Sequence, residues 1–103
     1  MDLGELRKTI LTLLEEVRVD VHWDHMLEQG HDVTDEEIRT ALAGGTFELH
    51  EDVDGRYVAT YLERGAPLAI VVVFEIHETG GGRRIDVVTA YHVPRSRDRA
   101  WGR

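Results

Sequence analysis

One strongly apolar run sets the fold class: residues Leu68 to Glu78 read LAIVVVFEIHE. Apolar residues stand at both odd and even positions, so the run predicts an inner strand that is covered on both faces. Three other strand-like runs flank it, reading TFELHE (46–51), GRYVATYLE (55–63) and RRIDVVTAYHV (83–93). Turn residues separate the runs at 54–55, 65–67 and 80–82. The C-terminal half is therefore predicted to be an antiparallel meander.

The N-terminal half carries helical signals around one short strand. Leucine, isoleucine and valine recur at helical spacing over residues 2–16, which predicts an amphipathic helix. Residues 17–23 alternate valine and tryptophan with polar residues, so they predict a strand with His22 opposite the valines. Residues 24–30 fit a short helical turn. A second helix is predicted after Thr34, where Glu37 completes a capping box, and it ends at Gly44-Gly45.

Helices followed by a run of strands predict an α+β domain, with the helices packed on one face of a twisted, mainly antiparallel sheet. The 103 residues fit a single α+β domain at 1–94 and a basic C-terminal tail at 95–103. The absence of cysteine excludes disulfides, thiolate metal sites and a cysteine nucleophile. Neither a membrane-spanning run nor a signal-peptide pattern is present, so we expect a soluble, cytoplasmic protein without membrane contact.

Charge is divided unevenly along the chain. Residues 1–54 hold 15 acidic against 4 basic residues, whereas residues 55–103 hold 5 acidic against 8 arginines. This asymmetry suits a cationic partner at one face and an anionic partner at the other, although solvation of a small domain explains it more simply. The net charge of −8 counts against general nucleic-acid binding.

Three of the six histidines lie within VHWDHMLEQGH, residues 21–31. A metal site built from His22, Asp24, His25 and Glu28 is one interpretation, but no established motif has this spacing, and no metal or cofactor is expected. The acidic run after Thr34 is explained by the helix dipole, which favours anions in a first turn. His50 and His77 have no partner in the pattern and are expected at the surface.

Four segments between residues 20 and 93 resemble a bacterial family of small domains of unknown function related to the RelE, ParE and BrnT toxins. They read HWDHMLEQGHDVTDEEIRTAL, GRY, PLAIVVVFE and RRIDVVTAY. The family typically shows HAxxRMxxRGI, a capped helix, a GR pair, an apolar strand and a closing VVTVY. The resemblance implies the RelE/ParE-like superfold, an antitoxin-like protein partner and RNA as a substrate. His22 falls on the family histidine, but His25 and Gln29 replace its two arginines, so the fold is implied more strongly than the reaction.

The first functional hypothesis is a toxin-related, metal-independent endoribonuclease. Histidine suits acid and base roles because its unperturbed pKa is about 6.5, so His22 and His92 would move protons. Arg56 and Arg84 would hold the phosphate, and Tyr91 would assist; His25 is the remaining candidate. This set requires His22, Arg56, Arg84 and His92 to share one open sheet face. The alternative is a non-catalytic binding or regulatory domain on the same scaffold, contacting a protein partner or a second copy of the chain. The sequence leaves open whether the protein is an enzyme.

Overall fold

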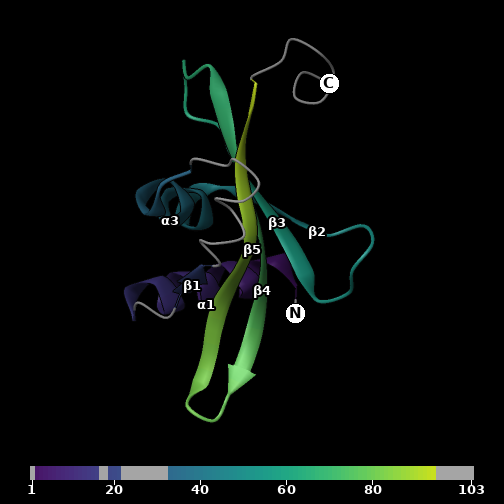
Figure 1. Ribbon diagram of the computed structural model, residues 1–103. Coiled ribbons are helices and arrows are strands. Elements are labelled where there is room, and N and C mark those ends of the chain that lie inside the picture. The colour runs from purple at the N-terminus through teal and green to yellow at the C-terminus, as the bar shows by residue number, and fades with distance from the viewer. Residues whose placement is uncertain (1, 17–18, 22–32, 95–103) are drawn as a thin grey trace.

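The computed structural model describes residues 2–16, 19–21 and 33–94 and has the predicted α+β architecture (Figure 1). Its helices are α1 (Leu3–Glu15) and α3 (Asp35–Gly44), and its strands are β1 (Val19–Val21), β2 (Thr46–Leu49), β3 (Arg56–Tyr61), β4 (Leu68–Thr79) and β5 (Gly82–Pro94). The strands form one open sheet in the order β1-β5-β4-β3-β2. Neighbours in the meander from β2 to β5 are antiparallel, whereas β1 runs parallel to β5.

Both helices begin at side-chain caps. The Asp2 carboxylate accepts a hydrogen bond from the backbone N–H of Glu5 at 2.9 Å, which satisfies a free donor in the first turn of α1. Thr34 and Glu37 form the predicted capping box at the start of α3. The predicted turn at residues 24–30 lies outside the described residues, as do the ends of the predicted 17–23 strand.

The main core lies between the two helices and one face of the sheet. Leu6 and Ile10 of α1 and Ile38 and Leu42 of α3 are fully buried there. Phe74 of β4 stands at the centre, with its ring centroid 6.0 Å from that of Phe47 and 5.6 Å from that of Tyr57. Neither helix of the described ranges is long and apolar enough to cross a membrane.

The inner position predicted for β4 is confirmed, since it pairs with β3 on one side and with β5 on the other. On the face opposite the helices, its residues Ala69, Val71 and Val73 are buried, while Glu75 and His77 are partly exposed. We call this opposite side the open face. Buried apolar residues of both parities are what the continuous apolar run of the strand indicates.

A β-bulge in β5 changes which side chains face the helices. Val73 pairs with Thr89 but Phe74 pairs with Val87, so Val88 is an extra residue on β5. Strict alternation predicts that Tyr91 faces the core and His92 the open face. Because one residue is added, the alternation reverses after Val88, and the prediction is wrong for both side chains.

An arginine of α1 closes the end of α3. The Arg7 guanidinium donates to the carbonyl oxygen of Ala43 at 3.2 Å and to that of Gly45 at 2.6 Å. Its Cζ atom also lies 4.6 Å from the centroid of the Phe47 ring. One side chain therefore satisfies carbonyls at the C-terminus of α3 and links α1 to β2.

Candidate functional site

A pocket of about 360 Å³ opens at the N-terminal end of α3, where the β3–β4 connection and the end of β5 meet it. We call it the helix-face pocket. Its wall carries three carboxylates, one imidazole and several apolar groups: Glu36, Glu37, Thr40, Tyr61, Glu63, Ala66, Pro67, Leu68, Ile70 and His92. No lysine or arginine is present among these residues. The described part of the wall therefore favours a cationic ligand over an anionic one.

Glu37 links the N-terminus of α3 to β5 at this pocket. Its Oε1 atom accepts hydrogen bonds from the Thr34 backbone N–H at 3.0 Å and from the Thr34 hydroxyl at 3.2 Å. Its Oε2 atom lies 2.8 Å from Nε2 of His92. The Thr34 backbone hydrogen bond, followed by the hydrogen bond from His92, lowers the pKa of the Glu37 carboxyl. The carboxylate is thus both ionised and oriented.

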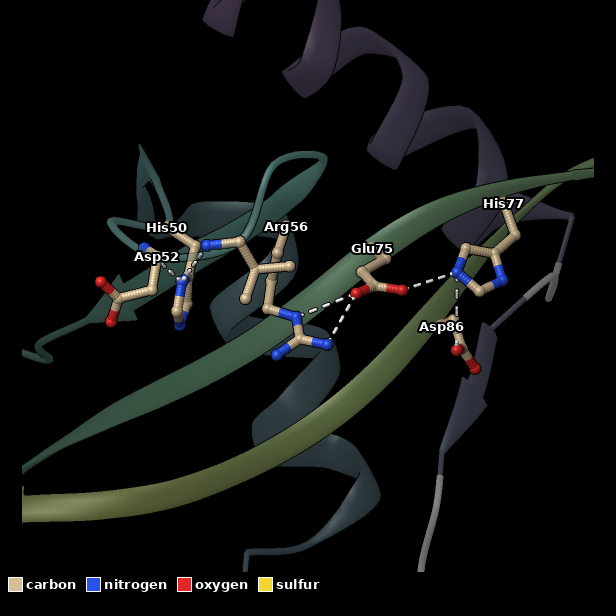
Figure 2. Close-up of polar contacts among 7 residues, drawn as sticks. His50, Asp52, Arg56, Glu75, His77 and Asp86 are labelled. Carbon is tan, nitrogen blue, oxygen red and sulfur yellow. Dashed lines mark hydrogen bonds and ion pairs between the residues drawn. The ribbon is translucent and has the colours of Figure 1, made fainter.

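A second group of polar residues crosses the open face (Figure 2). We call Arg56, Glu75, His77 and Asp86 the open-face cluster. Glu75 and His77 are two residues apart on β4 and so project from the same face. Strand pairing places Arg56 of β3 and Asp86 of β5 on either side of Glu75. In Figure 2 the helices lie behind the strands that carry these side chains.

The contacts in the open-face cluster are short. Arg56 donates through Nε at 2.9 Å and through Nη2 at 2.8 Å, both to Oε2 of Glu75. The other Glu75 oxygen, Oε1, lies 2.7 Å from Nε2 of His77, and that nitrogen is 3.9 Å from Oδ2 of Asp86. The hydrogen bond with His77, followed by that with Arg56, lowers the pKa of the Glu75 carboxyl. Glu75 is therefore a fixed anion between two nitrogen donors.

Charge continues along this line of the sheet. Asp20 of β1 pairs with Asp86, which adds an exposed carboxylate beside it. Beyond Arg56, the Nδ1 atom of His50 accepts the backbone N–H groups of Asp52 at 3.1 Å and Val53 at 3.2 Å (Figure 2). His50 thus holds the turn after β2, and its ring belongs to that turn rather than to the cluster.

The structure divides the candidate residues between the two faces of the sheet. Arg56, Arg84 and Tyr91 belong to the open face, where they pair with Glu75, His77 and Val71 respectively. His92 contacts Glu37 on the helix face, so its expected place beside the two arginines is wrong, because of the bulge at Val88. His22 and His25 lie outside the described residues, as do Asp24 and Glu28 of the alternative metal set.

The sequence patterns do not reveal two features of these candidate sites. The pattern gives His77 no partner, although the spacing of Glu75 and His77 on a strand places both on one face. The pattern predicts only a capping role for Glu37; that role is confirmed, and the contact with His92 comes in addition. The grouping of His77 with Glu75 and Asp86 could have been found from the register of the β4–β5 hairpin, which the triple glycine at 80–82 constrains. The contact of Glu37 with His92 depends on the β-bulge at Val88, which has no signal in the sequence pattern.

Comparisons with known proteins give no relative. No protein-family model matches the chain, and no curated protein or solved structure matches it. The residues described above are therefore the basis for any function.

Proposed function

We propose that this chain is a non-catalytic binding domain on a RelE/ParE-like scaffold, and that it holds a lysine or arginine side chain of a protein partner in the helix-face pocket. The observation that carries the proposal is the lining of the pocket, which among residues 2–16, 19–21 and 33–94 has three glutamates and neither lysine nor arginine. Helices on one face of an antiparallel meander, together with the sequence resemblance, support the choice of scaffold.

The pocket has the two parts that a long cationic side chain needs. Ile70, Leu68 and Tyr61 supply apolar and aromatic surface for a methylene stem or a guanidinium plane. Glu36 and Glu63 place carboxylates where the charged head would lie. Carboxylates bind guanidinium groups in a directed, bidentate way, so such a pocket selects by geometry as well as by charge.

Glu37 gives this pocket an oriented carboxylate. Its carboxyl is held ionised by Thr34 and His92, so it does not need the ligand in order to lose its proton. The contact with His92 also keeps the carboxylate from rotating away. An anion that is already oriented loses little conformational entropy when the partner binds.

The ribonuclease hypothesis ranks second because of where its cations lie. RNA cleavage needs cationic side chains on the phosphate as charge develops. Arg56 is engaged by Glu75 and His92 by Glu37, at 2.8 Å in each case. These two pairs also lie on opposite faces of the sheet, so one phosphate cannot contact both. The pairing of Arg56 with Glu75, and its separation from His92, favour binding of a protein over cleavage of RNA.

The test uses a fluorescein-labelled peptide that alternates arginine with glycine and serine, titrated with the full-length chain in fluorescence polarisation. We expect Glu36→Gln and Glu63→Gln each to weaken binding about fivefold, since one exposed charge pair contributes up to about 1 kcal/mol. Glu78→Gln is the matched control, because this carboxylate is 79% exposed on the β4–β5 hairpin, away from the pocket. Equal weakening by all three variants would mean general charge attraction and would reject the pocket.

A second experiment separates binding from cleavage. The chain is expressed in a bacterial host under tight induction, and total RNA is compared between the wild type and His22→Ala. We expect intact RNA in both. Degraded RNA in the wild type alone, with both proteins abundant and soluble, would establish the ribonuclease and overturn the proposal.

A further inference from the structure

We propose that the open-face cluster binds a divalent transition-metal ion, with Glu75, His77 and Asp86 as its protein ligands. Each offers one donor atom, and the three atoms lie within 4.8 Å of one another. A single imidazole with two carboxylates is a donor set that suits Zn²⁺, Mn²⁺ or Fe²⁺. This site is separate from the helix-face pocket and does not depend on the function proposed for it.

Two of the three distances between the donor atoms involve Nε2 of His77, and both are close to what one ion needs. Nε2 of His77 and Oδ2 of Asp86 are 3.9 Å apart, which is too long for a hydrogen bond. An ion about 2.0–2.2 Å from each atom spans that gap. Oε1 of Glu75 is 2.7 Å from the same nitrogen and has to move away by about 0.7 Å, because two ligands of a tetrahedral ion lie about 3.4 Å apart. The His77 side chain is 40% exposed, so its ring has room to make this adjustment.

Arg56 orients the site without occupying it. Both of its contacts go to Oε2 of Glu75, so Oε1 remains directed toward His77. Metal-binding carboxylates are commonly held in this way by a hydrogen-bond donor outside the coordination sphere. Arg56 is therefore a positioning residue, and it need not move when an ion replaces the proton between Oε1 and the imidazole.

Charge around the site allows a cation. Glu75 and Asp86 are opposite one another across β4 and β5, and Asp20 pairs with Asp86 on the other side. Like charges directly opposite each other destabilise a sheet, and a bound cation would remove that cost. Arg56 and Arg84 on the same face offset part of the negative charge. Because of the two arginines we expect micromolar rather than nanomolar affinity.

The experiment is calorimetric titration of the untagged, chelator-treated full chain with Zn²⁺. We expect saturable binding of one ion per chain. His77→Ala and Asp86→Asn should each weaken it by more than about tenfold, since even residues behind the ligands change affinity 10–100-fold. His50→Ala is the matched control, because His50 lies near the cluster and is used by its own turn. Circular dichroism without metal checks that each variant is folded.

The double variant His22→Ala/His25→Ala tests the rival histidines of the chain. Unchanged affinity in this variant supports the open-face site. Loss of binding there, with His77→Ala like the wild type, would overturn it, as would a wild type that shows no saturable binding. The absorption bands of bound Co²⁺ give a second readout, and they should disappear in His77→Ala but persist in Glu36→Gln. Because Glu36 lines the helix-face pocket and is not a proposed metal ligand, Glu36→Gln tests the pocket without changing the metal site.

Discussion

The Arg7 contact between α1 and the end of α3 can be tested by substitution. Arg7→Ala removes two charge-assisted hydrogen bonds, to Ala43 and Gly45, and the contact with the Phe47 ring. A hydrogen bond from a charged group contributes about 1.5–3 kcal/mol, and a cation–π contact about 0.5–1 kcal/mol. One of the two hydrogen bonds is exposed and counts for less. We therefore expect a loss of about 2–3 kcal/mol in the free energy of unfolding.

The assay is urea denaturation followed by circular dichroism, in which the midpoint should fall and the slope should stay unchanged. Arg7→Lys should recover about half of the loss, because lysine restores the charge but not the planar fork that reaches two carbonyls. Arg39→Ala is the control, since Arg39 makes an exposed contact with Asp35 at 2.8 Å and should cost less than about 0.5 kcal/mol. If Arg7→Ala lowers the free energy of unfolding no more than Arg39→Ala does, the stabilising role of the Arg7 contacts is refuted.

Two further outcomes follow from the core and from the pocket. Phe74→Ala should lower the free energy of unfolding by about 3–5 kcal/mol, because the ring is fully buried against Phe47 and Tyr57. Leu49→Ala is the control and should change it little, since this side chain is 67% exposed. Similar losses for the two variants in thermal melts would contradict the central place of Phe74 in the core. The lowered pKa of Glu37 means that its ionised form stabilises the fold. That contribution is complete above the unfolded-state pKa of a glutamate, about 4.3, and is lost as pH falls through the lower folded-state value. Glu37→Gln should therefore flatten the acid limb of the stability curve, and an unchanged acid limb would mean that neither the hydrogen bond from Thr34 nor that from His92 favours the ionised form.

Local patterns were sufficient for most of the fold. The capping box at Thr34 and Glu37 and the glycine turns each depend on a few adjacent residues, and all are found where the sequence predicts them. The parallel pairing of β1 with β5 joins segments more than sixty residues apart and leaves no local signal. The sheet was therefore predicted as mainly antiparallel without the position of its first strand.

The candidate site was harder to predict than the fold. An extra residue in a strand does not alter the hydrophobic pattern of VVTAY enough to be seen, yet it reverses every side chain after it. The faces assigned to Tyr91 and His92 failed for that reason. Glu75, His77 and Asp86 come together only through the register of the β4–β5 hairpin, which a pattern within one strand does not contain.

The bulge at Val88 also places the polar side chains at the two ends of β5 on opposite faces of the sheet. Residues before it supply Asp86 to one side of the sheet, and residues after it supply His92 to the other. A ligand at either end would therefore leave the opposite side accessible, and both could be occupied at once. Deleting Val88 would make every later side chain of β5 project from the other face of the sheet. Loss of a single codon is thus enough to move an imidazole from one surface of this molecule to the other.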